Sequence, residues 1–405
     1  DCRYNPLTFA TLPCKPGELA GEYLYAPQNG ITIASKGPSS KLPDVGMDVD
    51  GVATKFIWYK EDGSVLVEGK DYEIINGAVV FKDYSIGNVY CSMTNSVFPE
   101  LTLTTSEMRV AAPPTKVLGW MDVADYIYVS PEKEMYLSAA GSKEGDTIYI
   151  NWDGQGSVYS EYLLGPTYRI FKLDPEVGRR AVVYSYEDDD EGSLLVFSLN
   201  NVPLKAADFS GMTSLTDFDI SNAGCKDIVL PESDRLESLG LNGNGIESID
   251  SERLKGLKRL YADDNYLHKF DLSEFPSLEI ATLNGNGMTD IKFGNPNLWH
   301  LGLEKNLLEH IGFEGLPSLH QAYLRNNSLK SIDIDGPQLL RALFIDGNNF
   351  DFQTLPIVPE TVTEYHYSDQ ARIPAVINGL TVDLSSQAQR DGVNTVYYWC
   401  VDEPF

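Results

Sequence analysis

Positive charge is scarce in this chain. Among its 405 residues, 31 Lys and Arg stand against 59 Asp and Glu, which gives a formal net charge of -28. Such a surface repels a polyanion before any contact forms. We therefore expect no nucleic acid and no anionic membrane surface as partners. Basic proteins, glycans and divalent cations remain compatible with this charge.

Long hydrophobic runs and cysteines are also few. No apolar run approaches the roughly 20 residues of a transmembrane helix, so we expect no membrane insertion. No signal peptide is present at Asp1, although the sequence could be that of a trimmed mature protein. The five cysteines form no CxxC pair. We interpret Cys91 and Cys225 as buried thiols, and Cys2 with Cys14 as the one pair close enough in sequence to suggest a disulfide.

Catalytic motifs are missing as well. The five histidines form no HExxH, and the chain has neither GxSxG nor a phosphate-binding loop. The acidic run Glu187–Glu191 could hold calcium through its carboxylates, although such runs are more often simply solvated. We expect a protein that is not an enzyme, with no cofactor and no metal site.

One residue pattern recurs eight times between Leu194 and Leu355, at a spacing of 20 or 21 residues. A clear copy reads Leu236-x-x-Leu239-x-Leu241-x-x-Asn244-x-Ile246. The alternating leucines predict a short strand with one buried face, and the asparagine predicts a turn whose backbone amides it satisfies. The asparagines are Asn244, Asn265, Asn286, Asn306, Asn327 and Asn348, whereas the first two copies have Val202 and Ala223 there and are expected to cap the array.

This pattern resembles the leucine-rich repeat, in its short bacterial form. The resemblance implies a solenoid in which the strands form one concave sheet. A period of 20 or 21 residues leaves no room for a helix on the convex side, so we expect an extended or 3₁₀ return. No single repeat buries its own apolar face, and the stack should be stable only as a whole.

Upstream of the repeats, short alternating segments divided by Gly, Pro, Asn and Asp predict β-structure. Trp58 within Phe56–Tyr59 and Cys91 about thirty residues later resemble the Trp and second Cys of an immunoglobulin-like sandwich. The expected partner strand, Ile31–Ser35, has no cysteine, and Val89 replaces the usual tyrosine. The resemblance therefore implies a sandwich without its disulfide.

A second, small β module follows the Pro113-Pro114 boundary. Its expected strands are Glu134–Ala139, Thr147–Trp152, Tyr168–Leu173 and Arg180–Tyr186. The segment Ile148–Gly154 resembles the strand and turn that precede the repeats in surface proteins of gut Bacteroidetes.

A longer repeat is present too. Asn5-x-Leu7-x-Phe9-x-Thr11-Leu12-Pro13 recurs from Asn348 at an offset of 343, and Asp50-Gly51-Val52-x-Thr54-x-x-x-Trp58 recurs from Asp391 at an offset of 341. We therefore predict five parts in a mainly β chain. They are a remnant of a preceding repeat cap (1–24), an immunoglobulin-like sandwich (25–112), the small β module (113–190), the array (191–355), and a C-terminal cap or partial sandwich (356–405). The last part should dock on the final repeats with Tyr397 and Trp399 buried, or exchange strands with a neighbouring chain.

The register of the repeats identifies the outward positions of the concave strands, since side chains alternate between faces. The central row is Ser198, Asp219, Gly240, Tyr261, Thr282, Gly302, Tyr323 and Phe344. Its aromatic residues have no core to fill, and Tyr and Arg beside exposed aromatics are typical of binding hot spots. The predicted ligand-binding residues are Arg259, Tyr261, Asp263, Thr282, His300, Glu304, Tyr323, Arg325, Phe344 and Asp346. Alternatively, the aromatics shield strand edges or pack beneath the following module.

The whole layout resembles the multidomain surface proteins of Bacteroidetes. The resemblance implies export, either to the outer-membrane surface or as a secreted protein, and recognition of a host or bacterial surface protein or glycan. It carries over no catalytic residue. One alternative is a structural stalk or spacer of a larger cell-surface protein. Another is an accessory domain of a glycan hydrolase, for which exposed aromatics are the only support.

Overall fold

The computed structural model describes residues 1–18, 22–124, 134–152, 158–173, 179–186, 193–372, 376–379 and 381–398. Among these residues the regular secondary structure is almost entirely β-strand, as the sequence predicts, with two short 3₁₀ turns. The chain divides into two compact units, one of Asp1–Tyr128, Ala139–Leu194 and Ala207–Met212, the other of Val129–Ser138, Leu195–Ala206 and Thr213–Phe405. Among the described residues, no helix has the length and apolar character needed to cross a membrane.

The first unit begins with two antiparallel sheets. The larger contains β1 (Lys36–Gly37), β10 (Met108–Val110), β8 (Asn88–Thr94), β5 (Lys55–Lys60) and, beside β8, β9 (Thr102–Thr104). Its one parallel pair is β1 with β10. The smaller contains β2 (Ser39–Lys41), β7 (Ala78–Phe81) and β6 (Tyr72–Ile75), and a separate hairpin pairs β3 (Asp48–Val49) with β4 (Val52–Ala53).

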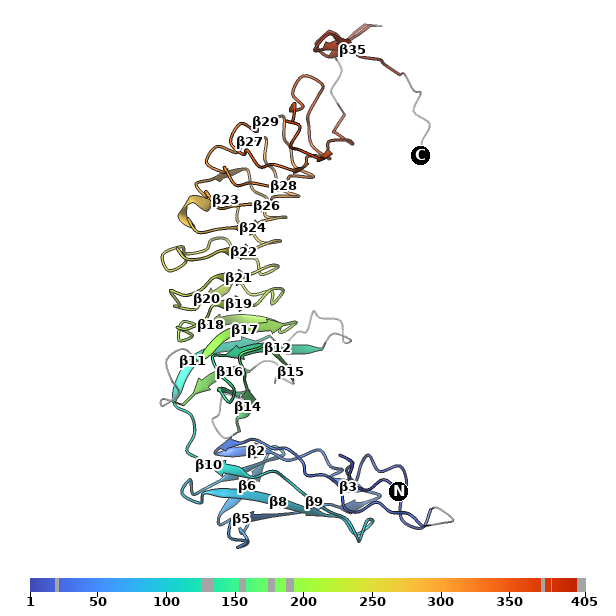
Figure 1. Ribbon diagram of the computed structural model, residues 1–405, viewed down its shortest axis with the longest axis vertical. Coiled ribbons are helices and arrows are strands. Elements are labelled where there is room, and N and C mark those ends of the chain that lie inside the picture. The colour runs from blue at the N-terminus through green and yellow to red at the C-terminus, as the bar shows by residue number, and fades with distance from the viewer. Residues whose placement is uncertain are drawn as a thin grey trace. The chain divides into compact units, whose positions relative to one another are not determined.

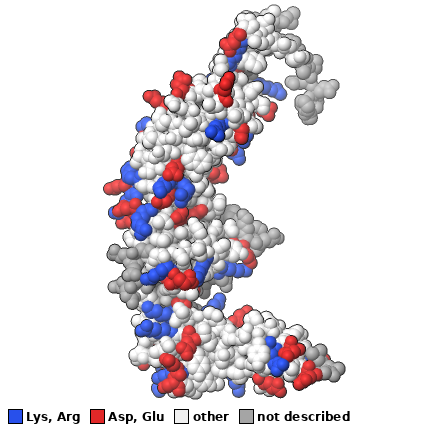
Figure 2. Space-filling view, in the orientation of Figure 1, with Lys and Arg blue, Asp and Glu red and all other residues white. Residues whose placement is uncertain are grey.

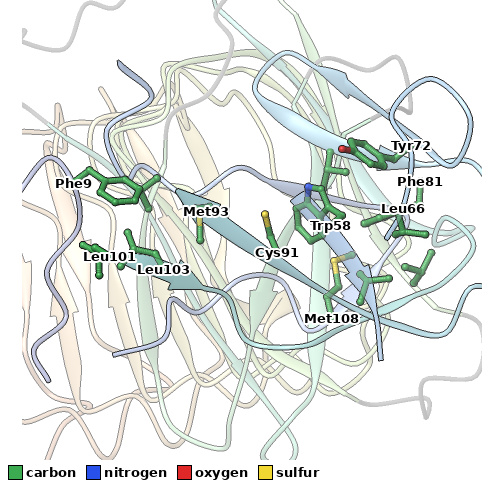
Figure 3. Packing of buried hydrophobic residues seen from close by; sticks show 14 of the residues in the cluster. Phe9, Trp58, Leu66, Tyr72, Phe81, Cys91, Met93, Leu101, Leu103 and Met108 are labelled. Carbon is green, nitrogen blue, oxygen red and sulfur yellow. The ribbon is translucent and has the colours of Figure 1, made fainter. Parts of the chain in front are cut away.

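Side chains from both sheets share one core (Figure 3). Trp58 is fully buried, lies opposite Cys91 in the β5–β8 register, and meets the edge of the Phe81 ring at 5.5 Å between ring centroids. The Trp58 and Cys91 pattern thus marks the centre of a two-sheet core. The immunoglobulin-like assignment itself stays a prediction.

The predicted Cys2–Cys14 disulfide is wrong, because both residues are free thiols in the structure. Each contacts the Tyr23 phenol instead, and the Cys2 Sγ lies 3.8 Å from the Tyr23 Oη. Burial, together with hydrogen bonds to the two thiols, raises the pKa of Tyr23. The predicted burial of Cys91 and Cys225 is confirmed.

In the rest of the first unit, four strands of a six-stranded sheet pair in the order β14-β13-β16-β11. Its strands are Ser160–Leu163, Thr147–Asn151, Arg180–Ser185 and Lys116–Val123, and β12 (Met135–Gly141) and β15 (Arg169–Leu173) lie in the same stretch of sequence. The Glu161 carboxylate accepts hydrogen bonds from the Ser35 and Tyr149 hydroxyls at 2.9 and 3.1 Å. This carboxylate therefore ties the small module to the sandwich. The acidic run Glu187–Glu191 lies outside the described residues.

The second unit is the repeat array, whose successive turns stack from β19 to β28 and beyond (Figure 1). Its parallel sheet contains β17 (Leu194–Asn200), β19 (Asp217–Asp219), β21 (Ser238–Gly240), β22 (Arg259–Tyr261), β24 (Ile280–Thr282), β26 (His300–Gly302), β28 (Gln321–Tyr323), β30 (Ala342–Phe344) and β31 (Glu364–His366). The sheet thus continues through β31, beyond the boundary expected at residue 355.

The returning side of each repeat is extended or 3₁₀, as the short period predicts. Its elements are β18 (Leu204–Asp208), β20 (Asp227–Val229), β23 (Lys269–Asp271), the 3₁₀ turn Leu272–Glu274, β25 (Asp290–Lys292), β27 (His310–Gly312) and β29 (Ser331–Asp333). From β17 to β30, the inward side chain of each main strand, such as Leu239, Leu260 or Leu301, is at most 1% exposed, whereas Tyr365 of β31 is half-buried. The leucine-rich repeat solenoid is confirmed.

Six turn asparagines form a ladder of hydrogen bonds through the array. The Asn306 Nδ2 donates to the carbonyls of Leu283 and Leu303 at 2.9 and 3.0 Å, and its Oδ1 accepts from the amides of Asn286 and Met288. The side chains of Asn286 and Asn327 make equivalent bonds. Each asparagine therefore satisfies buried groups of its own repeat and of the preceding one.

Gln370 extends this ladder past the last asparagine. Its Nε2 donates to the carbonyls of Ile345 and Tyr367 at 2.9 and 2.8 Å, and its Oε1 accepts from the Phe350 amide at 3.2 Å. A longer amide side chain thus ends the array at the turn after β31.

The C-terminal segment docks on the loop that follows the last asparagine. It contains β32 (Val376–Asn378), β33 (Thr381–Asp383), the 3₁₀ turn Ser385–Gln387, β34 (Gln389–Arg390) and β35 (Val393–Asn394). Gln387 is buried and donates to Asp351, while Arg390 donates to the carbonyls of Phe352 and Leu355. The expected burial of Tyr397 is wrong, because 39% of it is exposed, and Trp399 lies outside the described residues.

We predict that Asn286→Ala and Asn306→Ala each lower the free energy of unfolding by about 1 to 3 kcal/mol, because each leaves buried amides and carbonyls unpaired. Thermal or urea unfolding measures the loss. Asn349→Ala is the matched control, since Asn349 is exposed and its side chain donates a hydrogen bond to the Ser328 carbonyl at 3.2 Å. A midpoint unchanged for both buried variants contradicts the ladder's role.

The cysteines give a second prediction. Burial raises the pKa of the Cys91 thiol to about 12, so near neutral pH it remains protonated and unreactive. Iodoacetamide should therefore modify the half-buried Cys2 and Cys14 in the native protein, and reach Cys91 and Cys225 only after denaturation. Peptide mass spectrometry reads out each site, and equal native labelling of Cys91 and Cys14 would contradict the structure.

Candidate binding surface

The strand register aligns the outward positions of the parallel sheet in one central row. Tyr261 pairs with Gly240 and Thr282, Gly302 pairs with Tyr323, and Phe344 follows Tyr323. The row continues to His366 on β31, which the sequence analysis missed. Tyr365 and Gln370 replace the usual leucine and asparagine of that turn. Gln370 is the feature of the sequence that indicates this last strand, since glutamine has the same amide group as the turn asparagines.

Four rings of this row and its neighbour form an aromatic stack: His300, Tyr323, Phe344 and His366. Tyr323 and Phe344 are stacked at 4.7 Å between centroids with an interplanar angle of 6°, and Phe344 and His366 are stacked at 4.7 Å. His300 lies 5.2 Å from Tyr323 and its Nδ1 is 2.9 Å from the Gln321 Oε1. Neighbouring strands thus hold each ring in place.

This stacking limits how much of Phe344 a ligand could reach, although its role in ligand binding stays a prediction. Only 7% of the residue is exposed, so it offers little surface to a ligand, whereas Tyr323 remains half-buried. The sequence pattern gave an outward position but no sign of the neighbours that cover it. Here the alternative of packing and shielding describes Phe344 better than ligand contact does.

Arg325 connects three of the predicted residues. Its Nε lies 3.0 Å from Asp346 Oδ1, its Nη1 lies 3.5 Å from Glu304 Oε1, and its guanidinium is 4.4 Å from the centroid of Phe344. The contact with Glu304 is an ion pair without hydrogen-bond geometry, since that oxygen has no hydrogen-bond partner. Because about a third of the Arg325 side chain is exposed, these pairs contribute little stability but fix the position of the guanidinium.

The other predicted residues lie near Tyr261. Asp263 accepts a hydrogen bond from the Asn284 amide at 2.7 Å, and Arg259 donates to Asp217 at 3.2 Å. Asp263 is thus partly committed to the backbone of the next repeat. Tyr261 lies between the short side chains of Gly240 and Thr282, so it stands above its neighbours in the row.

Gly240 is required by the Asp219 carboxylate beside it. A Cβ at Gly240 would lie 2.5 Å from the Asp219 Cγ, which is closer than any real contact. The glycine therefore leaves room for the Asp219 side chain, which lies two strands before Tyr261 in the central row.

The outward face between β19 and β31 is acidic. Six acids, Asp217, Asp219, Asp263, Glu304, Asp346 and Glu364, occupy outward positions together with two arginines, Arg259 and Arg325, so the net charge of these groups is 2 − 6 = −4 with neutral histidines. Near β20, by contrast, charges of both signs are intermixed on the surface (Figure 2). Beside β20, Arg253 pairs with Glu232 at 3.4 Å. Elsewhere in the array, Lys258 pairs with Glu237 at 2.9 Å.

Other features of the array lie apart from these residues. A cavity of about 360 Å³ is lined both by apolar side chains, such as Ile228 and Val229, and by charged ones, such as Arg253. None of the predicted binding residues lines it. In the described part of the chain, no group of three His, Cys, Asp or Glu residues is placed to hold a metal ion.

The fold and the asparagine ladder define a protein of leucine-rich repeat type, and such a solenoid suggests a non-enzymatic scaffold for protein interactions. No family model matches the chain. It is similar to keratocan, a leucine-rich repeat protein, from Coturnix japonica and from Gallus gallus. In each case the identity is 27% over 194 residues, which cover 46% of this chain and 51% of the relative. The chain thus spans about half the length of the curated relatives it matches.

Replacement by alanine should destabilise the protein more at Phe344 than at Tyr261. We predict that Phe344→Ala lowers the free energy of unfolding by about 2 to 3 kcal/mol, because it removes a covered ring from the stack. Tyr261→Ala, the control, should cost less than about 1 kcal/mol, since its flanking side chains are short. Urea unfolding of both variants measures the difference, and equal losses would show that Phe344 is not covered as described.

Proposed function

We propose that this chain is a non-enzymatic recognition module that binds a basic protein segment through the outward face of its parallel sheet. The observation that carries the proposal is the pair Tyr261 and Tyr323, half-buried on a face with an excess of acids. Three strand spacings of about 4.8 Å separate them, roughly 14 Å. Only Thr282 and Gly302 lie between them in the row.

Physical arguments favour this face over others. Tyrosine offers a large contact area at a small entropic cost, and it is enriched among the residues that dominate binding energies. The two tyrosines lie on strands fixed by the asparagine ladder, so little order is lost on binding. The acidic border attracts a cationic partner and speeds its association.

The proposal extends to where the protein acts. We place it outside the cell, secreted or at the outer-membrane surface, as in the multidomain Bacteroidetes proteins that its layout resembles. A host or bacterial surface protein is the partner we favour, and a glycan is the second candidate. The support is the order of the array and β modules, together with the interaction role common to leucine-rich repeat solenoids.

The test is a binding screen of the intact chain against a panel of purified extracellular proteins and glycans. For a partner found in this way, Tyr261→Ala and Tyr323→Ala should each weaken binding about 30-fold, which corresponds to roughly 2 kcal/mol for a hot-spot residue. Raising the salt concentration should weaken it further if the partner is basic.

Tyr266→Ala is the matched control, because Tyr266 is 58% exposed in a turn and outside the three outward rows. It should bind like the unaltered chain, and unfolding curves check that all variants are folded. Binding that is insensitive to both row tyrosines overturns the assignment of this face. A folded chain that binds nothing on the panel favours the spacer alternative.

A further inference from the structure

The two ends of the chain contain the same loop. At the N-terminal end, the amides of Thr11 and Leu12 both donate to the Thr8 carbonyl, while the Thr8 amide donates to the Thr11 hydroxyl. At the C-terminal end, the amides of Thr354 and Leu355 donate to the Asp351 carbonyl, and the Asp351 amide donates to the Thr354 hydroxyl. Every one of these residues is displaced by 343 positions.

The turns that follow the two loops also agree. Tyr23 and Tyr25 have ring centroids 5.1 Å apart, and their counterparts Tyr365 and Tyr367 have centroids 4.7 Å apart. The Gln28 Nε2 donates to the carbonyls of Cys2 and Tyr25, as the Gln370 Nε2 does to those of Ile345 and Tyr367. The described residues of this segment, 1–18 and 22–28, therefore reproduce the turn that ends the array.

The same hairpin follows each of these turns. Asp50 and Gly51 at one end, and Asp391 and Gly392 at the other, have positive φ values of 54° and 77° and of 49° and 82°. The amide of Thr54 donates to Met47 at 2.8 Å, and that of Thr395 donates to Ala388 at 2.9 Å. The long repeat of the sequence is thus a repeat of structure, from the array cap to the first hairpin of a sandwich.

At the N-terminal end, an aromatic side chain joins the cap to the sandwich. Phe98, in the loop between β8 and β9, stacks on Phe9 at 6.0 Å and meets the Tyr25 ring at 5.8 Å. The Glu100 amide also lies 3.4 Å from the Tyr25 hydroxyl, to which it donates. Phe9 and Tyr25 are each only 3% exposed as a result.

At the C-terminal end, no aromatic side chain among the described residues covers the corresponding surface. Phe352 and Tyr367, the counterparts of Phe9 and Tyr25, are each 48% exposed. They line an apolar cavity of about 240 Å³ together with Phe350, Leu355 and Gln370. An apolar cavity of roughly 150 Å³ accommodates a benzene molecule, so this one has room for a benzyl group.

We propose that this cavity, the C-terminal socket, is a docking site for the phenylalanine of a sandwich loop of the Ser96–Glu100 type. The occupant is specified by the N-terminal copy, in which the same cap, the same pair of aromatic rings and the same hairpin receive Phe98. The sandwich that supplies the loop is one that begins with the hairpin β34–β35. Docking of the phenylalanine would then hold an array and the sandwich that follows it in one relative orientation.

The test is to add, after the hairpin β34–β35, the strands that a complete sandwich would need. Residues 1–395 are followed by an appended copy of residues 55–112, in the register that pairs Thr395 with Thr54. We expect the appended copy to fold. Hydrogen exchange of residues 350–371 should then slow at least about 10-fold relative to the unaltered chain, since their amides become covered.

Two variants of the appended copy alone separate the socket from general folding. Phe98→Ala there should restore fast exchange in residues 350–371 while the appended strands stay protected, and Ser96→Ala should not. Unchanged exchange around Phe352 and Tyr367 beside a folded appended copy overturns the proposal. An appended copy that stays unfolded overturns it as well, because the hairpin then does not start a sandwich.

Discussion

The asparagine ladder is the interaction on which the array depends. Each repeat must turn after a strand of three residues, and such a turn buries backbone groups that water cannot reach. One amide side chain at each turn satisfies groups of its own repeat and of the preceding repeat, as Asn306 does for Leu303 and Leu283. The ladder therefore couples neighbouring repeats as well as closing each turn. Where Gln370 takes the asparagine's place, the array ends but the coupling continues to its last strand.

Because the ladder fixes the register, it also fixes what the sheet presents on its outward face. Parallel pairing puts Tyr261 beside Gly240 and Tyr323 beside Phe344 without any contribution from a loop. Neighbours in the row then decide the exposure of each ring. Short neighbours leave Tyr261 standing above the row, while His366 and Arg325 cover Phe344. The same outward position thus has two different roles, and the difference comes from the side chains on adjacent strands.

This explains which features could be predicted from the sequence. The strands, the turn asparagines and the central row follow from local periods of two and of about twenty residues, which the chain carries in Leu239, Leu241 and Asn244. The four strands predicted for the small module, such as Thr147–Asn151, are also local and agree with expectation within two residues, whereas β11 and β14 were not predicted. The state of Cys2 and Cys14, the burial of Phe344 and the exposure of Tyr397 are set by contacts between distant segments. No periodic pattern encodes those contacts, so the sequence alone could not supply them.

The long repeat allows one such distant contact, that of Phe98 with the array cap, to be inferred from its second copy. The array cap occurs twice with the same hydrogen bonds from the glutamine Nε2 and within the threonine loop. The two copies differ in that an aromatic ring covers Phe9, whereas Phe352 is exposed. Since the cap has the same turn with Phe98 present and without a covering ring, Phe98 is not needed to form the socket that it occupies. The socket is formed by the cap itself. Gln28 or Gln370 closes the last turn and positions Tyr25 or Tyr367. The amide that ends the ladder therefore also prepares the surface on which a sandwich can dock.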